Sequence, residues 1–271
     1  MRESDAQFVG DIPANYDAHL GPVLFEAYAD DLARRAARGS PARVLELAAG
    51  TGILTERLHG ALGEIDRFVV TDLNAPMLEI ARTKLPDAAG AKFTACDAAA
   101  LDFPDDAFDL VACQFGVMFF PDRAAAYREA LRVLEPGGRY VFNSWAGMED
   151  NPFTLVAQAV MERVFPDYPP AFMNTPFGYA DPETIAGDLE AAGFAVAGSE
   201  TVAVDSPVES WESFARGLVH GNPTAEEVRS RGGTDPDDLV AALAGALRAD
   251  FGPEPGTVSL KAHVVEAEAP S

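Results

Sequence analysis

The stretch V-L-E-L-A-A-G-T-G-I-L-T, residues 44–55, constrains the fold more than any other part of this chain. The apolar run from Val44 to Leu47 predicts a buried strand, and the spacing of apolar residues after Gly52 predicts a helix. Two spaced glycines between a strand and a helix are typical of a loop whose backbone approaches a nucleotide-like ligand. The chain is therefore predicted to contain a strand, a glycine loop and a helix that form one α/β unit.

The same alternation continues along the first half of the chain. It predicts strands over 42–47, 67–72, 91–96, 107–115 and 139–145, with helices over 22–38, 52–62, 76–85 and 123–134. Asn74 and Pro76 suit the cap and first turn of the helix over 76–85, and the sequence P-G-G at 136–138 suits a turn before the strand at 139. Strands that alternate with helices in this way indicate a parallel sheet with crossover helices.

The pattern changes after Trp145. Helices are expected over 153–165, 183–193, 208–222 and 236–251, and strands over 194–204 and 257–269. The segment 166–182 is rich in proline and aromatic residues, which is typical of an inserted lid.

Charge and composition limit the partners. The chain has 43 acidic and 20 basic residues and a net charge of −23, which disfavours nucleic acid and anionic membrane surfaces. No apolar run reaches the roughly 20 residues of a spanning helix, and the first residues lack the layout of a signal peptide. We therefore expect a cytoplasmic protein. Cys96 and Cys113 have no ligand-like spacing, so no metal site is expected.

The glycine loop leaves two cofactor classes open. Gly50, Gly52 and Thr55 partly match the dinucleotide fingerprint G-x-G-x-x-G, and Asp72 follows about twenty residues later, where a nicotinamide site has its ribose-binding acid. However, the β-branched Thr55 replaces the third glycine, which normally permits close packing of the helix on the strand.

Two acids also favour a compact cationic nucleoside over a dinucleotide. Glu46, at the end of the first strand, offers a partner to an ammonium group. Asp97, just after the third strand, is placed to contact an adenine edge.

At this point the sequence resembles the Rossmann-like S-adenosylmethionine-dependent methyltransferases, and among them the UbiE-like small-molecule enzymes. The resemblance rests on V-L-E-L-A-A-G-T-G, V-V-T-D-L-N-A-P-M-L, F-T-A-C-D-A-A-A-L-D-F-P-D-D-A-F-D-L-V-A-C-Q-F-G-V-M-F-F and E-A-L-R-V-L-E-P-G-G-R-Y-V-F-N-S-W. It covers about residues 15–150 and implies an α/β fold: a Rossmann-like, seven-stranded, mostly parallel sheet with the last strand antiparallel and helical cap or lid insertions.

The resemblance also implies site residues. The loop around Ala48, Gly50 and Gly52 would approach the methionine part of the cofactor, with Glu46 near its amino group. Asp72 would accept both ribose hydroxyls. The remaining cofactor contacts would be Leu73 and Met77 beside the adenine, Asp97 and Ala98 at its edge, Gln114 and Phe115 facing the sulfonium, and Tyr16 as a lid contact.

The acceptor pocket is expected from the apolar and aromatic residues that follow the fourth and fifth strands and populate the lid-like loop. These candidates are Met118, Phe119, Phe120, Trp145, Asn151, Phe153, Phe172, Met173, Phe177 and Tyr179. They suit a small apolar or aromatic acceptor methylated at oxygen, nitrogen or carbon. No catalytic base is assigned, and His19 and His220 are the candidates if the acceptor must lose a proton.

We expect one methyltransferase domain over 1–271. Its predicted parts are an N-terminal helical lid (1–40), a cofactor-binding core (41–145), cap insertions (146–180 and 206–253) and a final strand (254–271). The alternatives are an NAD-dependent oxidoreductase and a scaffold that binds S-adenosylmethionine without transferring methyl.

Overall fold

A seven-stranded sheet with the order β3-β2-β1-β4-β5-β7-β6 organises the computed structural model, which describes residues 7–85 and 90–271. The strands are β1 (Arg43–Glu46), β2 (Arg67–Asp72), β3 (Lys92–Ala95), β4 (Phe108–Gln114), β5 (Leu134–Trp145), β6 (Ala195–Val208) and β7 (Gly256–Glu268). The pairs among β1 to β5 are parallel, and β7 pairs antiparallel with both β5 and β6. The predicted fold class is confirmed.

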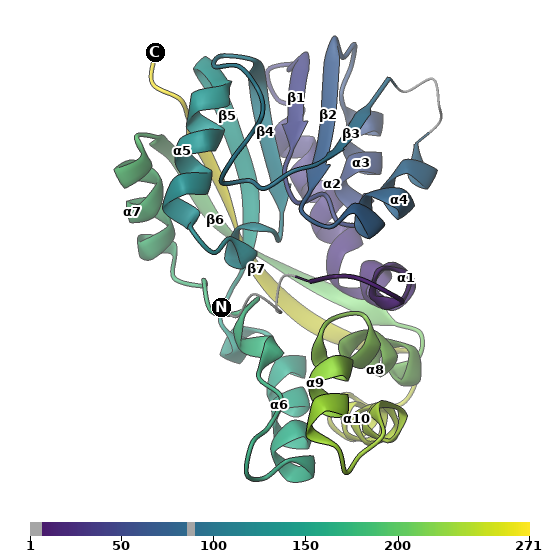
Figure 1. Ribbon diagram of the computed structural model, residues 1–271. Coiled ribbons are helices and arrows are strands. Elements are labelled where there is room, and N and C mark those ends of the chain that lie inside the picture. The colour runs from purple at the N-terminus through teal and green to yellow at the C-terminus, as the bar shows by residue number, and fades with distance from the viewer. Residues whose placement is uncertain (1–6, 86–89) are drawn as a thin grey trace.

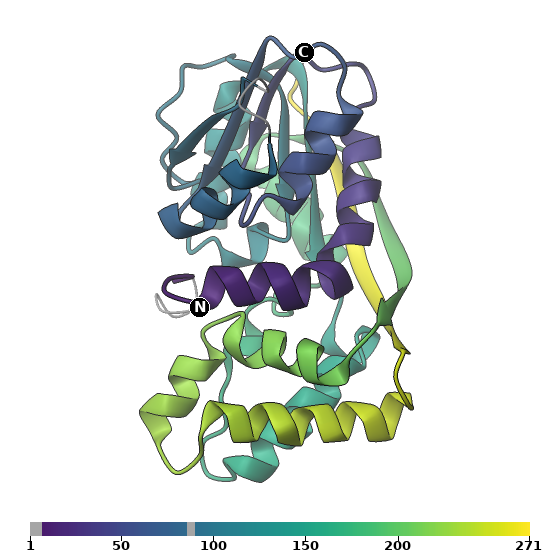
Figure 2. The ribbon, with the colours of Figure 1, turned by 90° about the vertical axis from the view of Figure 1, so that its right-hand side faces the viewer.

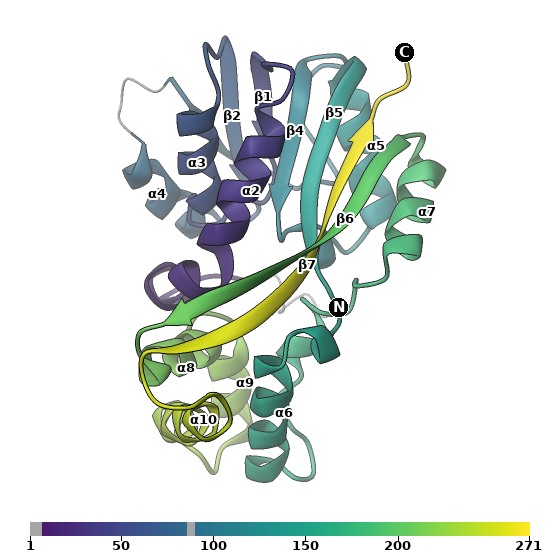
Figure 3. The ribbon, with the colours of Figure 1, turned by 180° about the vertical axis from the view of Figure 1, so that it is seen from behind.

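Helices cover both faces of this sheet (Figures 1 and 3). One face carries α2 (Glu26–Ala36) and α3 (Ile53–Ala61), and the other carries α5 (Arg123–Val133) and α7 (Pro182–Ala192). The helix α4 (Ala75–Lys84) follows β2 and packs on β2 and β3. Because both faces are covered, the central strand β1 is buried after its first residue, Arg43, and Val44 and Leu45 have no exposed surface.

The start of β5 differs from the prediction. The sequence Pro136–Gly138 indicated a turn before a strand at 139, but the strand runs from Leu134. The pairing of β5 with β4 shifts register between Phe108 and Leu110, so the turn residues form an irregularity within the strand.

The ribbon formed by β6 and β7 extends beyond the rest of the sheet. β5 pairs with β7 only from Ala262 to Glu268, whereas β6 accompanies β7 as far as Gly256. The outer end of this ribbon reaches a group of helices below the sheet, namely α6 (Phe153–Val164), α8 (Trp211–His220), α9 (Thr224–Arg231) and α10 (Pro236–Phe251) (Figure 1). The helix α9 was not predicted, because its exposed face is highly charged and its apolar positions are few.

A helical run extends from Ile12 to Ala36: its first part lies between the sheet and the lower helices, and α2 then runs along one face of the sheet (Figure 2). It comprises α1 (Ile12–Asn15), a π-helical segment (Tyr16–Phe25) and α2. The helix predicted over 22–38 is thus part of a longer helical run that begins at Ile12, and it ends at Ala36. Pro22, where the predicted helix began, lies inside the π-helical segment.

Within the described residues, every helix is too short or too polar to cross a lipid bilayer.

Candidate functional site

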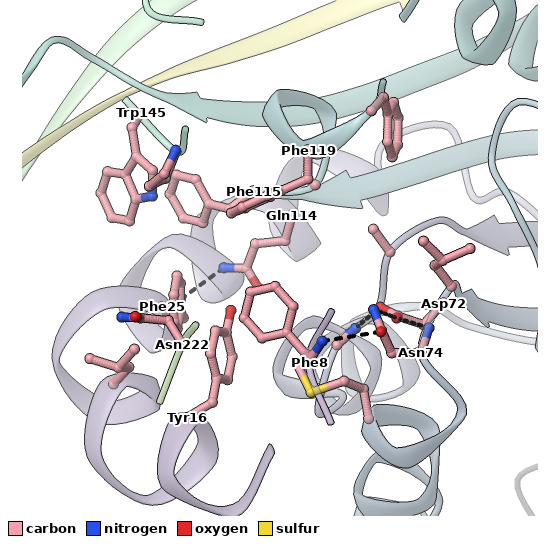
Figure 4. A pocket seen from close by; sticks show the side chains of 18 of the residues that line it. Phe8, Tyr16, Phe25, Asp72, Asn74, Gln114, Phe115, Phe119, Trp145 and Asn222 are labelled. Atoms are coloured by element: carbon pink, nitrogen blue, oxygen red, sulfur yellow. Dashed lines mark hydrogen bonds between the residues drawn. The ribbon is translucent and has the colours of Figure 1, made fainter. Parts of the chain in front are cut away.

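A cavity opens where the parallel strands end, between the sheet, the N-terminal helical run and the lower helices (Figure 4). One end is bordered by the glycine loop after β1 and the residues after β2 and β3, and the other by aromatic residues. Ligands of open α/β sheets bind at this edge, so its position alone makes the cavity the candidate site.

The glycine loop folds tightly because several of its residues take left-handed backbone conformations. Ala48, Gly50 and Gly52 have φ values of 51°, 58° and 82°. A Cβ atom on Gly52 would lie 2.8 Å from the Cα of Ala81 in α4, so glycine is required there by space as well as by conformation.

Asp72 closes the loop from the next strand. Its Oδ2 accepts a hydrogen bond from the Gly50 N–H at 2.9 Å, and its Oδ1 accepts one from the Asn74 N–H at 2.7 Å. Burial raises the pKa of this carboxyl, and the two backbone donors oppose that rise. Asp72 also lines the cavity, so its oxygens keep lone pairs for a ligand.

Asn74 has a different role from the one predicted. It precedes α4, but its side chain does not cap that helix; its Oδ1 instead accepts a hydrogen bond from the Phe8 N–H at 3.1 Å. The Phe8 ring is thereby held in the cavity beside Met77 and Phe172. The N-terminal segment is thus tied directly to the residues after β2.

Most predicted cofactor contacts line the cavity. Those that line it are Tyr16, Ala48, Gly50, Asp72, Leu73, Met77, Asp97, Ala98, Gln114 and Phe115. Leu73 is 56% exposed and stands at the rim. Asp97 is also exposed, and its Oδ1 accepts a hydrogen bond from the Ala99 N–H.

Glu46 and Gly52 do not border the cavity. Glu46 is fully buried, and its carboxylate oxygens have no well-formed hydrogen bond among the residues that the structure describes. Burial raises the pKa of this carboxyl from 4.5 to about 8, a rise that the nearby Thr55 hydroxyl reduces and the Asp72 charge increases. Its place near the amino group of the cofactor, directly or through water, stays a prediction.

Aromatic rings form the other end of the cavity (Figure 4). Phe115 stacks on Trp145 with centroids 3.9 Å apart, and Tyr16 stacks on Phe25 at 4.8 Å. Gln114 donates from Nε2 to the Phe25 carbonyl at 2.9 Å, which ties the end of β4 to the π-helical segment. This wall combines residues of the sheet with residues of the N-terminal run.

The structure separates the predicted acceptor residues into two groups. Phe119, Phe120, Trp145, Phe153, Phe172, Met173 and Phe177 line the cavity. Met118, Asn151 and Tyr179 do not: Met118 is buried in the core, Asn151 exchanges hydrogen bonds with Lys261, and the Tyr179 hydroxyl donates to Asp188. Strand and turn periodicity after β4 could not show that Met118 turns inward while Phe119 faces the cavity.

Neither candidate histidine borders the cavity. His19 Nδ1 lies 2.8 Å from Ser213 Oγ, and burial lowers the pKa of His19, with smaller contributions from Arg216 and His220. His220 Nε2 lies 3.0 Å from Asp237 Oδ1, in an outer groove next to the N-terminal segment. Both histidines therefore lie where they connect helices rather than where they face an acceptor.

The sequence interpretation missed several cavity residues. They are Phe8, Leu20, Leu24, Phe25, Thr71, Asn74, Cys96, Gly116, Pro121, Pro176, Leu218 and Asn222. Leu24 and Phe25 were assigned to an ordinary helix over 22–38 and Leu20 to the segment before it, whereas all three lie in the π-helical segment. Leu218 and Asn222 reach the cavity only because the β6–β7 ribbon carries α8 under the sheet, a long-range arrangement with no local signal.

The fold and the position of the cavity define an α/β protein with a Rossmann-like nucleotide-binding edge. A family model described as the ubiE/COQ5 methyltransferase family matches residues 22–175, and the chain belongs to this family.

Individual relatives of this chain are also methyltransferases by name. The chain is 33% identical over 165 residues to a ubiquinone/menaquinone biosynthesis C-methyltransferase UbiE from Proteus mirabilis, a match that covers 56% of this chain and 66% of that protein. It is 38% identical over 174 residues to a demethylmenaquinone methyltransferase from Thermus thermophilus, covering 58% of this chain and 76% of the relative. Among solved structures, the YcgJ protein of Bacillus subtilis superimposes with a TM-score of 0.59 at 19% identity, over 90% of this chain and 99% of that chain, which shows a shared fold.

The family match covers residues 22–175. The cavity residues outside it are Phe8, Tyr16, Leu20, Pro176, Phe177, Leu218 and Asn222. The glycine loop and the cavity residues after β2, β3 and β4 thus lie within the match, whereas the N-terminal segment and part of the aromatic end lie outside it.

Proposed function

We propose that this chain transfers a methyl group from S-adenosylmethionine to a planar, apolar small molecule. The observation that carries the proposal is one continuous cavity with a polar, carboxylate-bearing end at the glycine loop and an aromatic end facing it. Membership of the ubiE/COQ5 methyltransferase family supports it.

The polar end fits the cofactor. Asp72 is buried, and two backbone N–H groups fix its carboxylate while it still faces the cavity, which suits an acceptor of ribose hydroxyl hydrogens. Met77 and Leu73 offer apolar surface for an adenine, and Asp97 with Ala98 lies beside them. The core residues 41–145 would hold the cofactor, and the segments 1–40, 146–180 and 206–253 would cover it. When bound, S-adenosylmethionine supplies an activated methyl group on a positively charged sulfur.

The remaining work of the protein is positioning and exclusion of water. Phe115 and Tyr16 line the cavity within its aromatic wall, and aromatic rings attract positive charge. The aromatic residues beyond them hold a flat acceptor by apolar contact and keep water from the reacting atoms.

The acceptor proposed here is a hydroquinone-type ring methylated at carbon. The names of the Proteus and Thermus relatives refer to C-methylation in quinone biosynthesis and to demethylmenaquinone, respectively. The aromatic end of the cavity supports a flat, apolar ring of this kind. We further propose that the reaction takes place in the cytoplasm, since the net charge of −23 disfavours anionic membrane surfaces.

The test is incubation of the protein with S-adenosylmethionine bearing a deuterated methyl group and with three acceptors: a reduced 2-prenyl-1,4-naphthoquinone, a simple naphthol and an aromatic amine. Mass spectrometry should detect the label on a ring carbon of the hydroquinone. Binding of the cofactor without labelling of any acceptor would favour the scaffold alternative. In a parallel incubation with NADH and the oxidised naphthoquinone, reduction of the quinone without any methyl transfer in the first experiment would favour the oxidoreductase.

A further inference from the structure

The turn after β4 holds a strained residue at the aromatic wall. Phe115 follows the last residue of β4 and has a φ of 49°, although it is not glycine. Left-handed backbone is unfavourable for a bulky side chain, so the surrounding structure must maintain it.

Asn143 supplies the contact that maintains it. This residue lies on β5 opposite Gln114 in the parallel pairing, has no exposed surface, and accepts a hydrogen bond from the Phe115 N–H through Oδ1 at 2.8 Å. Its Nδ2 has no hydrogen-bond partner in the described part of the chain. The carbonyl oxygen is therefore the part of this side chain that carries a defined interaction.

The next residue keeps the turn close to the glycine loop. A Cβ on Gly116 would lie 2.5 Å from the Cβ of Ala48 and 2.6 Å from the Sγ of Cys113. The chain therefore passes directly against the left-handed Ala48 of the glycine loop.

The same turn directs the Phe115 ring. It stacks on Trp145, two residues after Asn143 on β5, with an interplanar angle of 10°, and it meets Tyr28 edge-on at 5.3 Å. Both rings of the stacked pair line the cavity. Asn143 itself does not line it, so any effect it has on a bound acceptor passes through Phe115.

We infer that Asn143 is a positioning residue for methyl transfer: by holding the Phe115 backbone in its left-handed turn, it keeps the Phe115–Trp145 pair against the reacting groups. This inference rests on the function proposed above. Without an acceptor at residue 143, the buried Phe115 N–H would be unsatisfied, and the turn would relax toward an extended conformation that moves the ring.

The test compares three single variants. Asn143→Leu has a similar size and no acceptor, Asn143→Asp retains an acceptor oxygen, and Ser144→Ala is the matched control. Ser144 is the next residue on β5, is fully buried, and donates to the Tyr179 carbonyl at 2.6 Å, so its loss also removes one buried hydrogen bond. Loss of one such bond typically costs a factor of about ten in an equilibrium or rate.

We expect Asn143→Leu to lower kcat about tenfold while the Kd for S-adenosylhomocysteine changes less than about threefold. Asn143→Asp should restore kcat to within about threefold of the native protein, and Ser144→Ala should lower the melting temperature without changing kcat. If Asn143→Leu does not fold, Asn143→Ala replaces it with the same expectation. Equal losses of kcat in the Leu and Asp variants, or an unchanged kcat in the Leu variant, would overturn the inference.

A second readout does not depend on activity. The chain has two tryptophans, so a Trp211→Phe background leaves Trp145 as the sole tryptophan. The fluorescence and near-ultraviolet circular dichroism of Trp145 should change in Asn143→Leu and stay as in the native protein in Asn143→Asp, because both signals depend on the Phe115 ring that stacks on the indole. Failure of the proposed function would appear as absence of methyl transfer by the native chain, whereas failure of this inference would appear as an unaltered Trp145 signal in Asn143→Leu.

Discussion

The phenyl ring of Phe115 lies nearly parallel to the indole of Trp145, with centroids 3.9 Å apart. Trp145 in turn lies 5.7 Å from Phe177, which meets Phe153 at 6.1 Å. These contacts join the ends of β4 and β5 to the lid-like loop and to α6. The acceptor end of the cavity is therefore a continuous aromatic surface assembled from segments far apart in the chain.

Truncating the far end of this surface should affect the acceptor and spare the cofactor. We expect Phe177→Ala to raise the KM for the acceptor about tenfold, because it removes a large apolar contact, and to leave the Kd of S-adenosylhomocysteine unchanged. Phe251→Ala is the control, since Phe251 packs on Trp211 at the end of α10 and does not line the cavity. Steady-state kinetics and calorimetry separate the two effects. An equal rise in the KM of the control would contradict this assignment of the aromatic end.

The histidines should be dispensable for transfer. His19 and His220 contact Ser213 and Asp237 outside the cavity, so His19→Gln and His220→Gln should each retain kcat to within about twofold at neutral pH. The measurement is the initial rate at saturating acceptor. A loss of about a hundredfold or more in either variant would show that the histidine reaches the acceptor during turnover.

Glu46 should make stability depend on pH. Its folded pKa of about 8 lies above the ordinary 4.5, so the folded protein binds a proton that the unfolded chain releases between these values. The contribution of this proton uptake to the free energy of unfolding is fully present below about pH 4.5 and is lost as the pH rises through about 8. Urea unfolding should show that the native protein loses stability relative to Glu46→Gln between pH 5 and pH 8. A constant difference between the two proteins would contradict the raised pKa.

Two glycines near α3 offer a matched pair of substitutions. Gly52→Ala should lower the free energy of unfolding by more than about 1 kcal/mol, because it combines a left-handed backbone with a close contact to Ala81. Gly60 lies within α3, and an added Cβ there meets no described atom within 4 Å. Gly60→Ala should therefore raise the free energy of unfolding by up to about 1 kcal/mol. Thermal and urea unfolding show whether each variant is more or less stable than the native protein. A lower free energy of unfolding in Gly60→Ala would contradict this account of the helix.

The sequence predicted the bounds of β1 to β4 well because these strands have only four to seven residues and are separated by clear turn residues. β2 was predicted at its observed bounds, and α10 likewise. The positions of Asp72, Asp97 and Gln114 followed from the ends of strands, because parallel strands bring their carboxyl ends to one edge.

The remaining part of the site depends on long-range packing. Phe8 enters the cavity through a hydrogen bond to Asn74, whose side chain was predicted to cap α4. Phe25 faces the cavity because of π-helical turns, and Asn222 because the β6–β7 ribbon places α8 under the sheet. Helical periodicity contains none of this information, since it describes neighbours along the chain only.

Calorimetric titration of the purified protein with S-adenosylmethionine, S-adenosylhomocysteine and NAD, in parallel with Asp72→Ala, tests the central claim most directly. The account predicts that both sulfur nucleosides bind, that NAD does not, and that Asp72→Ala weakens binding at least about a hundredfold, because it removes a charged hydrogen-bond acceptor and the support of the Gly50 N–H. Binding of NAD with no binding of the sulfur nucleosides would contradict the account and favour an oxidoreductase.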